Sequence, residues 1–174
     1  MITPKLRDAT QQDASAIALL HTKSWRTAYR GLLPDSYLDD NLLEERTRHW
    51  NWKLSSLSQK EFVIVAVEEN ELIGFAVVTD KPERGYEALL DNLHVLPTLK
   101  GKGLGSILIK AVALRLSQTG RKNFYLWVLQ GNTPAEAFYK SRGGTRADQT
   151  TGIFGGKTVH ETRFVWDNLD MLLD

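Results

Sequence analysis

Residues 89–116 read LLDNLHVLPTLKGKGLGSILIKAVALRL and contain three successive patterns. The apolar run from Leu89 to Val95 is typical of a buried strand, and it ends shortly before Pro97. A glycine-rich segment follows, and from Leu104 onward the apolar residues recur at helical spacing. The stretch therefore predicts a strand, a glycine loop and a helix, and the rest of the chain is interpreted around this unit.

The glycine loop has the features of a phosphate-binding site. Gly101, Gly103 and Gly105 alternate where the helix begins, and the first N–H groups of a helix have no intrahelical partners. The positive end of the helix dipole lies at the same place, and Lys100 and Lys102 add positive charge. The loop favours a ligand that carries a diphosphate. The alternative is a glycine turn that does no more than lead into the helix.

Two common phosphate loops do not fit the spacing of these glycines. A dinucleotide-binding loop requires G-x-G-x-x-G, but Ser106 stands where the third glycine would be. A P-loop requires G-x-x-x-x-G-K-[ST], and Ser106 also occupies the position of its second glycine. The spacing excludes both of these motifs.

Composition limits the class of protein. The chain has 174 residues, 42% of them hydrophobic, which predicts one domain spanning residues 1–174. The net charge of +1 and the interspersed charges argue against a nucleic-acid partner. The absence of cysteine excludes disulfides and thiol nucleophiles, and the four histidines lack ligand spacing, so we expect no metal site. With neither a membrane-length apolar run nor a signal peptide, we expect a cytoplasmic protein without a membrane partner.

The other elements follow from hydrophobic periodicity and turn residues. Strands are predicted at 5–9, 62–67, 72–79 and 124–129, helices from about 10 to 30, at 42–57 and at 133–142, and a final hairpin within 145–166. This order is not a simple alternation of strands and helices. It indicates an α/β chain with a mixed sheet flanked by helices.

Two motifs carry a resemblance to a known family. The loop Lys100-Gly101-Lys102-Gly103-Leu104-Gly105 resembles the acetyl-coenzyme A loop [QR]-x-x-G-x-[GA] of the GNAT acetyltransferase superfamily, with lysine at its first position. Residues 132–144, NTPAEAFYKSRGG, resemble the GNAT signature N-x-x-A-x-x-F-Y-x-x-x-G-F, with Gly144 in place of the final aromatic residue. The order of elements is also similar to that of GNAT proteins. The resemblance implies a mostly antiparallel central sheet of about seven strands.

The resemblance further implies an N-acetyltransferase that uses acetyl-coenzyme A as its cofactor. Asn132 is expected to bond the pantetheine or its neighbouring strand, and backbone N–H groups of the central strand are expected to meet the oxyanion. The residues expected to bind the cofactor are Leu93, His94, Val95, Lys100, Gly101, Lys102, Gly103, Leu104, Gly105, Ser106 and Asn132.

The implied reaction is attack of a neutral amine on the acetyl thioester. By resemblance Tyr139 lies beside the thioester sulfur, and a hydroxyl with an ordinary pKa of about 10 can protonate a thiolate whose conjugate acid has a pKa of about 8.5. Asp91 or His94 is the first expectation for the general base, with Glu161 and His160 as alternatives. Strict alternation along the central strand predicts that Asp91 and His94 face opposite sides.

The acceptor is left open by the sequence. Trp25 and Tyr29 belong to an aromatic and cationic cluster, and they are expected either to line the acceptor pocket or to pack in the core. A small amine, a polyamine, an antibiotic, an amino acid and a protein N-terminus all remain as acceptors. Two other functions also remain, a non-catalytic acetyl-coenzyme A sensor and an acyltransferase that uses another acyl group or a hydroxyl acceptor. A homodimer is a further open alternative.

Overall fold

The computed structural model describes residues 3–174, which form one seven-stranded sheet in the order β1-β2-β3-β4-β5-β7-β6. Its strands are β1 (Lys5–Asp8), β2 (Phe62–Glu68), β3 (Glu71–Thr79), β4 (Leu89–Val95), β5 (Phe124–Leu129), β6 (Thr145–Phe154) and β7 (Lys157–Trp166). Across the described chain β4 and β5 run parallel, and the other neighbouring strands run antiparallel. The predicted mixed, mostly antiparallel sheet is confirmed.

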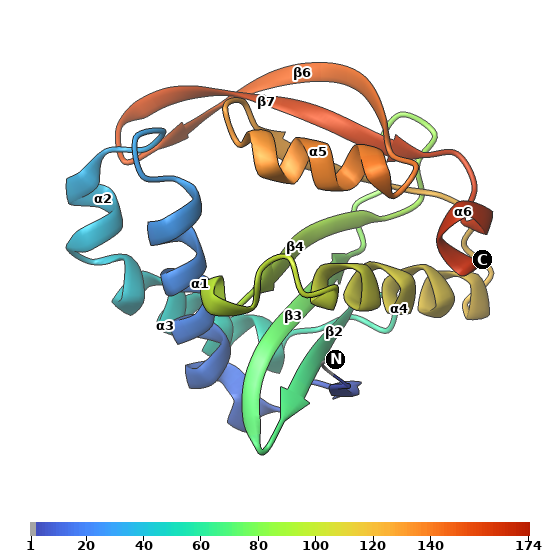
Figure 1. Ribbon diagram of the computed structural model, residues 1–174, viewed down its shortest axis with the longest axis horizontal. Helices are drawn as coiled ribbons and strands as arrows, with labels where there is room; N and C mark the ends of the chain where they lie inside the picture. The colour runs from blue at the N-terminus through green and yellow to red at the C-terminus, as the bar shows by residue number, and fades with distance from the viewer. Residues whose placement is uncertain (1–2) are drawn as a thin grey trace.

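Helices cover both faces of this sheet (Figure 1). On one face lie α1 (Ala14–Ala28) and α3 (Leu42–Ser55), joined by the short α2 (Asp35–Asp39). On the other lie α4 (Leu104–Gln118), α5 (Thr133–Ser141) and α6 (Asp170–Leu173). The 3₁₀ turns η1 (Gln11–Asp13) and η2 (Pro97–Leu99) complete the fold. Within residues 3–174, none of the helices combines the length and the apolar character that a membrane crossing needs.

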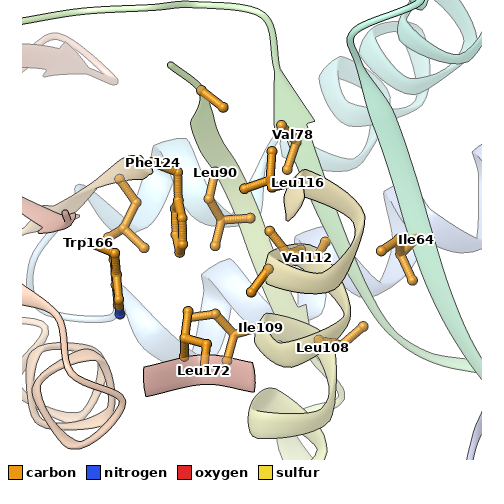
Figure 2. Close-up of a cluster of buried hydrophobic side chains, with 14 of the residues drawn as sticks. Ile64, Val78, Leu90, Leu108, Ile109, Val112, Leu116, Phe124, Trp166 and Leu172 are labelled. Atoms are coloured by element: carbon orange, nitrogen blue, oxygen red, sulfur yellow. The ribbon is translucent and has the colours of Figure 1, made fainter. Parts of the chain in front are cut away.

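The larger core lies between α4 and the sheet. Figure 2 shows side chains of α4, among them Ile109 and Val112, directed at the side chains of the strands. Phe124 and Trp166 stack with ring centroids 4.6 Å apart. A Cβ atom on Gly144 would lie 2.6 Å from Trp166 Cζ2, so the Trp166 ring occupies the space beside this glycine. Trp166 thus supplies aromatic packing where the sequence motif lacks its final aromatic residue.

The sheet opens between its two parallel strands. Leu89 and Tyr125 form the one register pair that joins β4 to β5 in the described chain, and beyond that pair the two strands part. β5 continues to pair with β7 along its whole length. A gap therefore forms in the middle of the sheet, at the carboxyl ends of β4 and β5.

Candidate active site

A cavity of about 870 Å³ lies at this gap and is lined from both faces of the sheet. From one face α1 and α3 contribute His21, Trp25 and Arg46; from the other, the start of α4 and α5 contribute Gly103 and Tyr139. The parted strands contribute residues 89–95 and 126–129. Two ligands that enter from opposite faces of the sheet can therefore meet within this one cavity.

The glycine loop forms an open cradle at the end of the cavity next to α4. Gly101 and Gly103 have φ values of 78° and 87°, and a Cβ atom added to either would meet nothing within 4 Å. Gly103 is the N-cap of α4, and no side chain among residues 3–174 caps this helix. The first N–H groups of α4 are therefore available to a ligand, and this arrangement fits a diphosphate.

Most of the residues predicted to bind the cofactor lie around the cavity. The residues of this set that line it are Leu93, His94, Val95, Lys100, Gly101, Gly103, Gly105, Ser106 and Asn132. Leu104, the first residue of α4, is buried in the core, and Lys102 is exposed and does not line the cavity. Asn132 Oδ1 accepts a hydrogen bond from the Ala135 N–H at 3.4 Å, so its side chain caps α5.

A β-bulge in β4 corrects the predicted alternation of Asp91 and His94. The register with β3 pairs Asn92 with Val77 and Leu90 with Val78, which leaves Asp91 as an extra residue. His94 faces α1, and Asp91 lies within the electrostatic influence of Lys53 and His49 of α3. The bulge turns Asp91 to the face that His94 also uses, because an inserted residue breaks the period of two.

His94 is a neutral, hydrogen-bonded side chain. Its Nδ1 lies 2.9 Å from Ser24 Oγ, and its ring centroid lies 4.7 Å from that of His21. Burial, with smaller contributions from Arg46 and Lys100, lowers the pKa of His94 to about 3. A ring with so low a pKa is a weak proton acceptor, so His94 is better suited to positioning than to general base catalysis.

Asp91 and Glu161 form an acidic pair in the cavity wall. The Asp91 side chain is accessible from the cavity, but the protein around it removes part of its hydration and so raises its pKa, and the nearby cations, Lys53 first, offset part of that rise. Loss of hydration also raises the pKa of Glu161, and the charge of Asp91 adds to this rise. His160 is exposed and does not line the cavity. Of the four residues considered as a base, Asp91 and Glu161 have the raised pKa that proton abstraction favours.

Tyr139 projects from α5 into the cavity lining, and its ring packs 5.2 Å from the Phe138 ring and 6.0 Å from the Trp166 ring, centroid to centroid. Burial raises the pKa of its hydroxyl, and the nearby Tyr29 adds to the rise. The hydroxyl therefore remains protonated at neutral pH and is available as a donor.

The cluster around Trp25 lies on the α1 and α3 side of the cavity. Trp25 is 8% exposed, and its ring lies 5.0 Å from the Tyr29 ring. The Arg46 guanidinium lies 4.2 Å above the centroid of the Trp25 ring. Burial and the charge of Glu161 raise the pKa of Tyr29 to about 12. Both residues predicted for the acceptor pocket thus line the cavity, and both also pack against neighbours.

Several residues of this lining were not predicted from the sequence, among them Arg46 and His49 of α3. Their spacing of three places them on one face of the helix, next to the buried Trp50. That spacing beside a tryptophan was the available signal, but charged residues on an amphipathic helix ordinarily face solvent.

Comparison with known proteins agrees with the motifs and the fold. The profile of the acetyltransferase (GNAT) family matches residues 22–143. The chain belongs to the GNAT family of acetyltransferases. YuaI of Bacillus subtilis, an uncharacterised N-acetyltransferase, is 28% identical to this GNAT chain over 169 residues, which cover 96% of this chain and 95% of YuaI. A ribosomal protein bS18 alanine N-acetyltransferase of Haemophilus influenzae is 26% identical over 110 residues, 61% of this chain and 73% of that protein.

Solved GNAT structures share the fold. PaiA N-acetyltransferase of Thermoplasma acidophilum, crystallised with coenzyme A, superposes with a TM-score of 0.74 at 20% identity, covering 92% of this chain and 98% of that one. YncA of Salmonella typhimurium, crystallised with acetyl-coenzyme A, has a TM-score of 0.69 at 19% identity, with coverage of 97% and 95%. The predicted acyltransferase family is confirmed, and at the level of the family so is its acetyl-coenzyme A cofactor.

Proposed function

We propose that this GNAT chain transfers the acetyl group of acetyl-coenzyme A directly to a primary amine. The observation that carries the proposal is the cavity at the gap between β4 and β5, with the glycine cradle of α4 at one end and the acidic pair Asp91 and Glu161 in its wall. The cradle suits the diphosphate of the cofactor, and the carboxylates suit an amine. Both ligands then share one cavity, as direct transfer requires.

The residues of the chain divide the work of this reaction. Bound acetyl-coenzyme A supplies an activated acetyl thioester. The uncapped N–H groups at Gly103–Ser106 hold its diphosphate, and Lys100 adds charge beside them. Asp91, directly or through a water molecule, removes a proton from the ammonium group, since an alkylamine with a pKa of about 10.4 is almost fully protonated at pH 7.

Tyr139 acts at the other end of the reaction. Its Oη keeps its proton at neutral pH because burial disfavours the phenolate. Proton transfer from Tyr139 Oη to the leaving sulfur neutralises the thiolate as the C–S bond breaks. The attacking nitrogen must lose a second proton to become the amide, and this proton restores the Tyr139 hydroxyl, so no phenolate remains. Tyr139 is therefore proposed as the general acid, and His94, held by Ser24, as a positioning residue.

Relatives support an amine as acceptor. The Haemophilus influenzae protein acts on the alanine of a ribosomal protein, and the structurally similar PaiA and YncA bind coenzyme A or acetyl-coenzyme A. A sensor without turnover would need the glycine cradle, but it would have no use for two carboxylates of raised pKa in the same cavity.

The test is thiol release from acetyl-coenzyme A in the presence of an acceptor panel. The panel contains polyamines, amino acids, peptides with free N-termini and hydroxyl compounds, and mass spectrometry identifies each product. We expect release with at least one primary amine and a mass gain of one acetyl group. Binding of acetyl-coenzyme A without release would favour the sensor, and a product formed on a hydroxyl or with another acyl donor would favour the other acyltransferase.

A further inference from the structure

One side of the cavity holds a cation that is poorly neutralised by the protein. Arg46 projects from α3 into the lining, and its side chain is 12% exposed. Within residues 3–174 its one ion pair is a long contact of 3.7 Å with the half-exposed carboxylate of Glu45, and its Nε is buried without a hydrogen-bond partner. A charge enclosed in this way is costly unless a ligand completes its hydrogen bonds.

Two buried N–H donors in the same wall also have no partner in the described part of the chain. His21 is 1% exposed, and its Nδ1 accepts a hydrogen bond from Trp50 Nε1 at 3.1 Å, so its Nε2 carries the proton and is left unpaired. Trp25 Nε1 is likewise buried and unpaired, and the Trp25 ring lies under the Arg46 guanidinium. Buried donors normally find partners, so these two indicate an absent acceptor of hydrogen bonds.

The three groups lie apart from the glycine cradle. Arg46, His21 and Trp25 come from α1 and α3, which pack on one face of the sheet, and α4 packs on the other. The diphosphate of the cofactor has its own donors at the start of α4. The unsatisfied groups on the α1 and α3 side are therefore available to the acceptor.

The same cavity also contains the acidic pair. Asp91 and Glu161 line it, and Arg46 influences the ionisation of Asp91. The cation and the two carboxylates therefore line the same cavity. His21 and His94 stay neutral because burial lowers the pKa of both, so neither ring adds positive charge beside the two carboxylates. The acceptor side thus presents opposite charges to a single ligand.

We propose that the acceptor is an amine that also carries a carboxylate, that is, an amino acid, with Arg46, Trp25 Nε1 and His21 Nε2 binding the carboxylate. The inference rests on the acetyltransferase function proposed above. Arginine presents donors that match the two oxygens of a carboxylate, and the two N–H groups add directional hydrogen bonds. The ammonium group then lies toward Asp91 and Glu161, which can bind and deprotonate it. A polyamine has no group that would satisfy Arg46.

The experiment compares matched acceptors. Each α-, β- and γ-amino acid in the panel is measured with its carboxamide and with the corresponding amine that lacks the carboxyl group. We expect kcat/KM for the best amino acid to exceed that of its carboxamide and its amine by about 100-fold, since hydrogen bonds to charged groups are each worth about a factor of ten or more. Equal turnover of the three would overturn the inference.

Variants at Arg46 assign the effect to the residue. Arg46→Gln should lower kcat/KM for the amino acid by about 10- to 100-fold, mostly through KM. The kcat/KM for the carboxamide and the KM for acetyl-coenzyme A should stay nearly unchanged. Arg46→Lys should recover part of the loss. The matched control is Arg48→Gln on the same helix, where the side chain is 73% exposed, and it should behave like the wild type. A loss in Arg46→Gln that is equal for all three acceptors would point to a packing role on Trp25 and contradict the proposal.

The outcomes separate this inference from the proposed function. Turnover of amines without preference for a carboxylate defeats the inference alone. Failure of every amine to release thiol defeats the proposed function. In that case calorimetry with the coenzyme A-loaded protein still decides the inference, because amino acids should bind more tightly than their carboxamides, and equal binding would refute the carboxylate site.

Discussion

Tyr139 combines a packed ring with the hydroxyl that we propose as the general acid. The ring contacts Phe138 and Trp166, so Tyr139→Phe should preserve the fold and the affinity for acetyl-coenzyme A. Loss of the general acid should lower kcat by about 10² or more, and the loss should shrink for a thioester whose thiol has a lower pKa. Steady-state kinetics with both thioesters measures this.

The control for Tyr139 is Tyr86→Phe, which removes a hydroxyl bonded to Asp167 away from the cavity and should leave kcat unchanged. A normal kcat for Tyr139→Phe, under conditions where the chemical step limits the rate, would show that the proton comes from another source.

Asp91 predicts a dependence of activity on pH. A carboxylate accepts a proton only when ionised, and because its pKa is raised by lost hydration, kcat/KM should fall at a higher pH than an ordinary carboxyl pKa of about 3.9 would allow. Asp91→Asn should lower kcat by about 10²–10⁴ and abolish this acidic limb. The exposed carboxylate of Asp8, substituted as Asp8→Asn, is the control. An unchanged limb in Asp91→Asn would assign it to Glu161.

The same substitution has a predictable effect on stability. Because the pKa of Asp91 is raised in the folded state, the folded protein binds more protons than the unfolded chain between the two pKa values, and stability falls as pH rises through that window. Asn does not titrate. The melting temperature of Asp91→Asn relative to wild type should therefore increase between pH 4 and pH 7, and thermal unfolding at the two pH values measures the difference.

At the scale of elements, the start of α4 is the proposed binding site for the diphosphate of the cofactor. Gly103→Asp introduces a negative charge beside the diphosphate and a side chain at a φ of 87°, and it should weaken acetyl-coenzyme A binding at least about tenfold. Gly103→Asn has similar shape and tolerates this φ, so it should retain more affinity. Isothermal titration calorimetry measures both.

Gly120 provides the control for this prediction. It lies just beyond the other end of α4, has a φ of 79° and is equally open, so Gly120→Asp should bind acetyl-coenzyme A normally. Equal affinity of Gly103→Asp and the wild type for acetyl-coenzyme A would show that the glycine cradle does not bind the cofactor.

The elements also show what a sequence can and cannot predict. The ranges of β4 and β5 and the final hairpin within residues 145–166 agree with the prediction, because apolar runs and turn residues are strong local signals. The short helices α2 and α6 were missed, since one turn has no periodicity to detect. The bulge at Asp91 and the inward position of Arg46 depend on β3 and α1, which no local pattern reports.

For the whole molecule, cofactor binding should appear as stabilisation. A ligand at about 100 times its Kd adds ~2.7 kcal/mol to the free energy of unfolding, provided that it binds only the folded state. For a domain of this size that corresponds to a rise in Tm of about 5–10 °C. Thermal unfolding with acetyl-coenzyme A measures the rise, and Gly103→Asp at the same concentration should show a smaller one. No rise in the wild type would contradict binding to the folded protein.

The parting of β4 from β5 has a consequence for association with other chains. Each strand presents an unpaired edge to the gap beyond Leu89 and Tyr125, and such edges ordinarily recruit further strands and promote aggregation. Here residues of α1, α4 and α5 line the same cavity, so these edges lie in the middle of the sheet rather than at its outer rim, where strand addition normally occurs. The protein thus holds unpaired backbone N–H and C=O groups inside the cavity, where a narrow, extended ligand can form hydrogen bonds with them.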